Sequence, residues 1–244
     1  MADKLWYFVM VPMVYLAFAW LIVWIVIKII EIVRTPNFAP TLRIFPEGAN
    51  SRDSPRHPLA GAVWDTFTMP SVRRLNPVLW VFLCIFHVSI ALLILAHLDL
   101  LPQAHIMPAT SEHMIGNGAV GIAVTVSILY FLFRRFRTPV RELSVPADYL
   151  LLILLLAIVV TGDIMSWGNS WAENGFVITK KDFGNYLNSL VRFSFTDPRQ
   201  FLAGSHYAVI GLHVLLANLF LIVLPFSKVM HVFFAVPLNK LRRG

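Results

Sequence analysis

Residues 213–231, with the sequence HVLLANLFLIVLPFSKVMH, place a histidine at each end of an almost wholly apolar segment. A helix of this length and composition can cross the hydrocarbon core of a membrane. Ionisable side chains inside a membrane are costly, so each of them needs a partner or a function. The segment therefore predicts a membrane-spanning helix on which His213 and His231, about five turns apart, have a specific role.

The composition of the whole chain leads to the same class of protein. Of its 244 residues, 58% are hydrophobic and only 14% are charged, and the mean hydropathy is +0.72. Long apolar runs at this density indicate membrane spans, and their lack of alternation excludes a β-barrel. We expect a single all-α integral membrane domain, residues 1–244, with five spans at about 5–30, 76–98, 116–133, 149–167 and 201–231. The first run is too long for a signal peptide and lacks a small-residue cleavage site.

The distribution of lysine and arginine predicts the orientation. Fifteen of these residues lie on the side that holds the loop 34–75 and the C-terminus, and five lie on the other side. The positive-inside rule therefore places the N-terminus outside and the C-terminus in the cytoplasm, with loop 34–75 cytoplasmic and loop 168–200 outside. The net charge of +7 is then a signal of topology, and no nucleic-acid partner is expected. We also expect a short interfacial helix at 60–68 and an amphipathic turn near 186–193.

Four histidines fall within the second and fifth spans. His87 and His97 are ten residues apart, about 15 Å along a helix, whereas His213 and His231 are about 27 Å apart on a straight one. Because the second helix runs outward and the fifth runs inward, His97 pairs with His213 near the outer face and His87 pairs with His231 deeper in the membrane. The two spacings differ by about 12 Å, which helix tilt and a break at Pro225 must absorb.

Imidazole pairs on facing helices suit the axial ligation of haem iron. Two other classes stay open at this point. One is a haem-free transporter or proton channel lined by histidines, and the other is a membrane anchor for a peripheral enzyme, which would leave the four histidines without a purpose.

Specific motifs carry a family resemblance. FHVSIALLILAHL (residues 86–98) and LHVLLANLFLIVLPFSKVMH (residues 212–231), with the block Pro225-Phe226-Ser227-Lys228, resemble the respiratory nitrate reductase gamma subunit family, as does GNGAVG at 116–121. The resemblance implies a five-helix cytochrome b of the prokaryotic cytoplasmic membrane with two b haems. The outer haem would be bound by His97 and His213, and the inner haem by His87 and His231. It further implies an electron-transfer subunit of an oxidoreductase complex, which passes electrons between a quinone near the outer haem and a cytoplasmic iron–sulfur partner.

One segment points to a particular branch of that family. WDTFTMPSVRRLNPVLW (residues 64–80) looks like the cytochromes associated with sulfite reductase in sulfur-metabolising microbes. This branch implies menaquinone as the quinone, a partner similar to heterodisulfide reductase, and a role in dissimilatory sulfur metabolism. The single cysteine, Cys84, leaves no cysteine-held iron–sulfur cluster in this chain. A nitrate reductase gamma subunit proper, and a hydrogenase or formate dehydrogenase cytochrome, are the alternatives within this class.

The quinone site has weaker signals. The loop before the third helix has no lysine, although the resemblance implies a basic residue near the quinone, so His113 or Glu112 would serve instead. His206 lies two turns before His213, nearly on the same face. Asp163 lies near the outer end of the fourth helix, where an acid is a candidate for a proton path.

Overall fold

The computed structural model of the chain describes residues 2–34, 58–101, 103–104, 106, 118–171, 180–202 and 207–243. Within these ranges every regular element is an α-helix or a short 3-10 helix. Five helical stretches are long and apolar enough to cross a membrane: Asp3–Glu31, Pro77–Asp99, Ala119–Phe136, Pro146–Trp167 and Tyr207–Phe226. The prediction of an all-helical protein with five spans is therefore confirmed, and its orientation in the membrane stays a prediction.

The first span consists of two helices, and each later span contains one long helix. In chain order these helices are α1 (Ala2–Met10), α2 (Pro12–Arg34), α5 (Pro77–Asp99), α6 (Ala119–Phe136), α7 (Pro146–Trp171) and α9 (Tyr207–Val223). Four shorter helices complete the described chain, namely α3 (Pro58–Thr68), α4 (Pro70–Leu75), α8 (Lys180–Val191) and α10 (His231–Arg243). The bounds of α5, α6 and α7 differ from the predicted spans by at most four residues.

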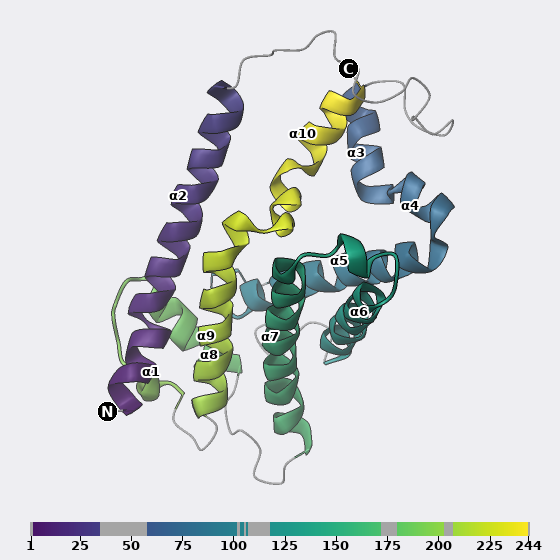
Figure 1. Cartoon of the computed structure of the whole chain (residues 1–244). Coiled ribbons are helices and arrows are strands. Elements are labelled where there is room, and N and C mark those ends of the chain that lie inside the picture. Colours follow the sequence, from purple (N-terminus) through teal and green to yellow (C-terminus); the bar gives the residue numbers. More distant parts are fainter. Residues whose placement is uncertain are drawn as a thin grey trace.

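Neighbouring helices follow an order that differs from the order of the sequence. Helix α9 packs against α2 and α7, α7 packs against α6, and α6 packs against α5. In Figure 1, α2, α7 and α9 run roughly from top to bottom of the view, while α5 runs from side to side behind α7. Helices α5 and α9, which carry the paired histidines, make little direct backbone contact. Side chains therefore bridge the distance between these two helices.

The break between α1 and α2 falls at Val11–Pro12. Proline lacks the N–H that would bond the carbonyl four residues earlier, and it bends the chain, so backbone carbonyls around the break lose their helical partners. In a membrane such groups must be satisfied within the protein. The Asn218 amide on α9 donates to the carbonyl of Val9 at 2.9 Å, and the Tyr186 hydroxyl on α8 donates to that of Met10 at 2.6 Å.

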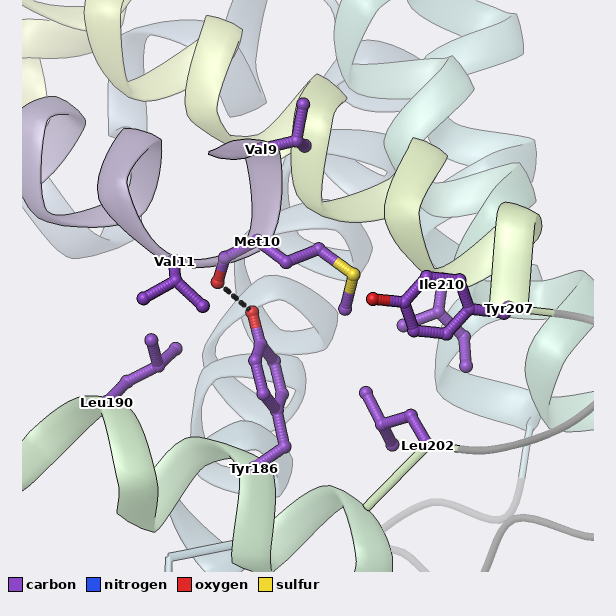
Figure 2. Close-up of a cluster of buried hydrophobic side chains, with 8 residues drawn as sticks. All are labelled: Val9, Met10, Val11, Tyr186, Leu190, Leu202, Tyr207 and Ile210. Atoms are coloured by element: carbon purple, nitrogen blue, oxygen red, sulfur yellow. Dashed lines mark hydrogen bonds between the residues drawn. The ribbon is translucent and has the colours of Figure 1, made fainter. Parts of the chain in front are cut away.

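These two hydrogen bonds lie beside the largest buried cluster among the described residues, which joins α8 to α1, α2 and α9 (Figure 2). Its members are Val9, Met10, Val11, Tyr186, Leu190, Leu202, Tyr207 and Ile210. Burial raises the pKa of Tyr186, which keeps its hydroxyl protonated as a donor. The turn expected near 186–193 is thus part of a helix that begins earlier, at Lys180, and buries its apolar face within the protein.

Helices α3 and α10 lie together at the end of the bundle opposite α1 and α8 (Figure 1). The Asn239 amide on α10 donates to Thr66 Oγ1 on α3 at 2.9 Å, and the Trp80 indole on α5 donates to the carbonyl of Thr68 at 2.8 Å. A helix is present where a short interfacial helix was expected, at 60–68, and it begins two residues earlier; its place at the membrane interface stays a prediction. It connects the C-terminal helix to the start of the second span.

The fifth span, expected over 201–231 with a break at Pro225, is interrupted at that proline. Helix α9 ends at Val223 and is followed by two 3-10 turns, η3 (Leu224–Phe226) and η4 (Lys228–Met230). Pro225 has no backbone N–H and cannot donate a helical hydrogen bond. Ser227, between the two turns, has an extended backbone with φ −102° and ψ 163°. His231 consequently begins a separate helix, α10, instead of ending α9.

The hydroxyl of Tyr186 should contribute measurably to stability. Tyr186→Phe leaves the buried carbonyl of Met10 without this donor, which should destabilise the chain by about 1–3 kcal/mol. Tyr130→Phe is the matched control, because within the described chain the Tyr130 ring stacks on Phe82 at 3.9 Å and its hydroxyl has no hydrogen bond. Thermal unfolding in detergent, followed by circular dichroism, measures both variants. Equal melting temperatures would contradict the role assigned to Tyr186.

Candidate functional site

The structure brings the four intramembrane histidines together as two pairs. The rings of His97 on α5 and His213 on α9 have centroids 6.4 Å apart, and their planes are within 7° of parallel. The rings of His87 on α5 and His231 at the start of α10 have centroids 6.1 Å apart, with planes at 80°. These are the two pairings expected from depth along the helices.

The broken fifth span explains how both pairs form. A straight helix would separate His213 from His231 by about 27 Å, whereas the two histidines on α5 are about 15 Å apart. Helix α5 crosses the bundle obliquely (Figure 1), and η3 and η4 redirect the chain between α9 and α10. The difference in spacing is therefore absorbed by the crossing of α5 and by the two turns after Val223.

In three of the four histidines, Nδ1 bonds to a carbonyl near in sequence. The Nδ1 atoms of His87 and His97 each lie 2.7 Å from the carbonyl oxygen four residues earlier on α5. That of His231 lies 2.9 Å from the carbonyl oxygen of Lys228. A carbonyl only accepts, so Nδ1 carries the proton and Nε2 has the free lone pair. This is the tautomer that binds a metal through Nε2.

His213 is held by another helix. Its Nδ1 lies 3.1 Å from the carbonyl oxygen of Ile158 on α7 and 3.0 Å from Thr161 Oγ1. The single hydroxyl hydrogen of Thr161 is directed to carbonyls of its own helix, at 2.8–2.9 Å, so its oxygen accepts from His213. A Cβ on Gly162 would lie 3.4 Å from His213 Cε1, which shows how closely this ring packs on α7. The apolar pattern of the fourth span gives no signal for Thr161 as a partner of the histidine.

The spacing of the rings fits a metal atom between them. Two imidazoles on opposite sides of one metal, each bonded at ~2.0 Å through a nitrogen ~1.1 Å from the ring centre, have centroids about 6.2 Å apart. Both observed separations lie close to this value. Within the described residues, no three His, Cys, Asp or Glu side chains are placed to share a metal ion. Each pair would thus supply two imidazole nitrogens to a haem, whose iron would provide one-electron redox chemistry.

Asp163, a candidate for the quinone site, faces α6. It is only 8% exposed, and its Oδ2 accepts a hydrogen bond from Thr125 at 2.9 Å. Its other oxygen lies against Gly121, where a Cβ would overlap it. Thr161, which contacts His213, lies two residues before Asp163, so the two side chains point about 200° apart around α7. Asp163 therefore faces away from the surface that holds His213. The other candidates, Glu112, His113 and His206, lie outside the described residues.

A lysine approaches the outer end of α5 from a segment that gave no such signal. Lys180, at the start of α8, lies with its Nζ 2.6 Å from Oδ2 of Asp99, two residues after His97. Helix α8 comes so close to this end that a Cβ on Gly184 would lie 2.6 Å from the carbonyl oxygen of Leu100. Loop 168–200 therefore brings a basic side chain to the end of α5 that carries His97, which the spacing along the sequence could not indicate.

Five helices long and apolar enough to span a membrane, with two close pairs of imidazoles, define a multi-pass helical membrane protein with two candidate ligand pairs. The sequence model of the nitrate reductase gamma subunit family matches residues 75–244, and the chain belongs to this family. The match begins at the end of α4 and includes both histidine pairs. The family and the five apolar helices confirm the predicted location as a multi-pass protein of the prokaryotic cytoplasmic membrane.

Two curated archaeal relatives share the name "Hdr-like menaquinol oxidoreductase cytochrome b-like subunit". The protein from Archaeoglobus fulgidus is 30% identical over 176 residues, which cover 66% of this chain and 50% of the relative. The protein from Archaeoglobus profundus is 27% identical over 171 residues, which cover 63% of this chain and 46% of the relative. The chain thus spans about half the length of the curated relatives it matches.

The contact between Gly121 and Asp163 predicts a specific coupling between α6 and α7. Gly121→Ala places a methyl group on the carboxylate and should destabilise the chain by about 1–3 kcal/mol. In the Asp163→Ala background the same change should cost much less, because the obstructing group is gone. Gly162→Ala is the control, since its Cβ meets His213 at 3.4 Å, an ordinary contact distance. Melting temperatures that change additively would show that Asp163 does not face Gly121.

Proposed function

We propose that the chain is the dihaem cytochrome b subunit of a membrane quinol oxidoreductase complex. The observation that carries this proposal is the pair of imidazole gaps, 6.4 and 6.1 Å between ring centroids, with Nδ1 of every ring engaged. We assign His97 and His213 to an outer haem and His87 and His231 to an inner haem. A haem bound between two imidazoles supplies an iron that takes up and releases one electron at a time.

The protein's own contribution is to hold these two sites at fixed positions inside the membrane. The pairs are separated by ten residues of α5, about 15 Å, which is short enough for electrons to pass without a moving carrier. Hydrogen bonds to carbonyls of the same helix fix the rings on α5, and apolar spans exclude water around them. Moving charge across a membrane is worth about 2.3 kcal/mol per elementary charge per 100 mV, so such a path would couple redox chemistry to the membrane potential.

The ends of the path follow from the predicted orientation. We propose that a quinol, menaquinol by analogy with the names of the relatives, reacts near His97 and His213 at the outer face. Asp163, His206, His113 and Glu112 are the residues we propose for handling its protons. The family membership and the names of both relatives support a quinone as the substrate.

At the other end, we propose a cytoplasmic iron–sulfur partner similar to heterodisulfide reductase, in a complex of dissimilatory sulfur metabolism. His231 is the first residue of α10, and α10 packs on α3 at the predicted cytoplasmic end. A partner that docks on these helices would lie next to the inner pair. The words "Hdr-like" in the relatives' names support this class of partner.

Haem content tests the central assignment. The purified chain should contain two b haems, and His97→Ala should contain one, because a haem that keeps a single axial ligand is bound weakly. His213→Ala should lose the same haem, and the double variant His97→Ala/His213→Ala should lose no more. His87→Ala combined with His97→Ala should lose both. Reduced-minus-oxidised spectra with a pyridine haemochrome assay give the counts.

The control for this series is His57→Ala, a change in the cytoplasmic loop that should keep both haems. A purified wild-type chain with no b-type spectrum would overturn the cytochrome assignment and favour a haem-free membrane protein. Loss of different haems in His97→Ala and His213→Ala would overturn the pairing alone.

Thr161 should tune the outer site only. The hydrogen bond on Nδ1 makes the imidazole a stronger donor to the metal and favours the oxidised state. Thr161→Val removes one of the two acceptors of His213, so the midpoint potential of one haem should rise. A hydrogen bond is worth about 1 kcal/mol, and if about half of this differs between the two redox states the rise is on the order of 20 mV. Thr161→Ser keeps the hydroxyl and should keep the potential. Optical redox titration measures both, and equal shifts in Val and Ser variants would contradict this role.

A further inference from the structure

A buried carboxylate at the inner end of the bundle collects donors from three segments. Asp148, in the first turn of α7, is 6% exposed. Its Oδ2 accepts from Nζ of Lys228 at 2.8 Å and from Nη1 of Arg135 at 3.2 Å. The same oxygen accepts from the backbone N–H of Val145 at 3.3 Å. One side chain therefore links α6, the start of α7 and the turn η4.

The turn η4 directly precedes His231, and its position depends on this link more than the positions of α5 and α9 do. It consists of three residues, Lys228–Met230, after the extended Ser227. Its backbone packs mainly against its neighbours in sequence, η3 and α10. A single 3-10 turn has poor hydrogen-bond geometry and little rigidity of its own. The ion pair between Asp148 and Lys228 ties this turn to a transmembrane helix.

Lys228 in turn orients His231. Its carbonyl oxygen accepts the hydrogen bond from Nδ1 of His231 at 2.9 Å. The side chain and the backbone of Lys228 thus connect the carboxylate of Asp148 to the imidazole ring. The other three histidines do not need such a connection, because His87 and His97 bond within α5 and His213 bonds to α7.

We propose that Asp148 is the positioning residue of the inner histidine pair, acting through Lys228. The proposal rests on the proposed binding of haem by His87 and His231. The Asp148 carboxylate holds η4 so that the ring of His231 faces that of His87, and it balances two cations beside this pair. Without it, Lys228 and Arg135 repel each other, the turn loses its tie, and extra positive charge favours the reduced state of a nearby redox group.

Single-haem backgrounds make the test specific. In His97→Ala, which should retain only the inner haem, Asp148→Asn should raise the midpoint potential and change the low-spin electron paramagnetic resonance signal. In His87→Ala, which should retain only the outer haem, the same change should leave both properties unaltered. Lys228→Met also breaks the ion pair and should change the inner resonance signal in the same background, but it should not raise the midpoint potential, because it removes a positive charge. Lys228→Arg should keep the original signal, because it keeps the ion pair.

Two controls separate positioning from general effects. Glu142→Gln removes an exposed negative charge near the same end of the bundle and should leave the inner haem unchanged. The melting temperature reports any loss of fold, and because Lys228 is 69% exposed the ion pair should contribute little to it. An unchanged inner haem in both Asp148→Asn and Lys228→Met, or equal shifts in both haems, would overturn the proposal while leaving the dihaem assignment intact. Absence of haem in the wild-type chain would overturn the assignment as well.

Discussion

The constraint on which this structure depends is the cost of an unsatisfied polar group inside a membrane. A straight apolar helix meets that constraint by itself, and a broken helix does not. The break at Pro12 is stabilised by side chains from two other helices. Asn218 donates a hydrogen bond to the carbonyl of Val9, and Tyr186 donates one to the carbonyl of Met10. The packing of α8 and α9 around α1 follows from this arrangement, since both donors must be held in place by buried neighbours.

The same constraint governs the histidines. An imidazole in a membrane has two nitrogens to satisfy, and in all four residues Nδ1 is bonded to a carbonyl oxygen. The rings of each pair lie 6.1–6.4 Å apart between α5 and the broken fifth span. These helices make little direct backbone contact, so the space between them is set by the series of contacts from α5 to α6, from α6 to α7 and from α7 to α9. Helix packing thus determines the ring separations that suit a bound metal.

The sequence predicted the features that depend on composition and spacing along one helix. The five spans follow from apolar length, and the pairing of His97 with His213 and of His87 with His231 follows from depth in antiparallel helices. The sequence could not predict the contacts that join distant parts of the chain, namely those of Thr161, Asn218, Lys180 and Asp148. Each joins residues at least 52 positions apart. The helices also follow a different order in space from their order in the chain. The length of α8 was also missed, since its buried face is formed only when the break at Pro12 provides a surface to cover.

The two histidine pairs are supported in different ways, and this difference has a functional meaning. The outer pair joins two transmembrane helices, and His213 is braced by a third. The inner pair joins α5 to a residue that follows a single 3-10 turn and begins α10, the helix that packs on α3. A force on α3 or α10 therefore reaches His231 directly, whereas it reaches His213 only through η3 and η4. The break at Pro225 thus does more than reconcile two spacings: it makes the position of His231 depend on α10 and its contact with α3, whereas His213 is held within the bundle by α7.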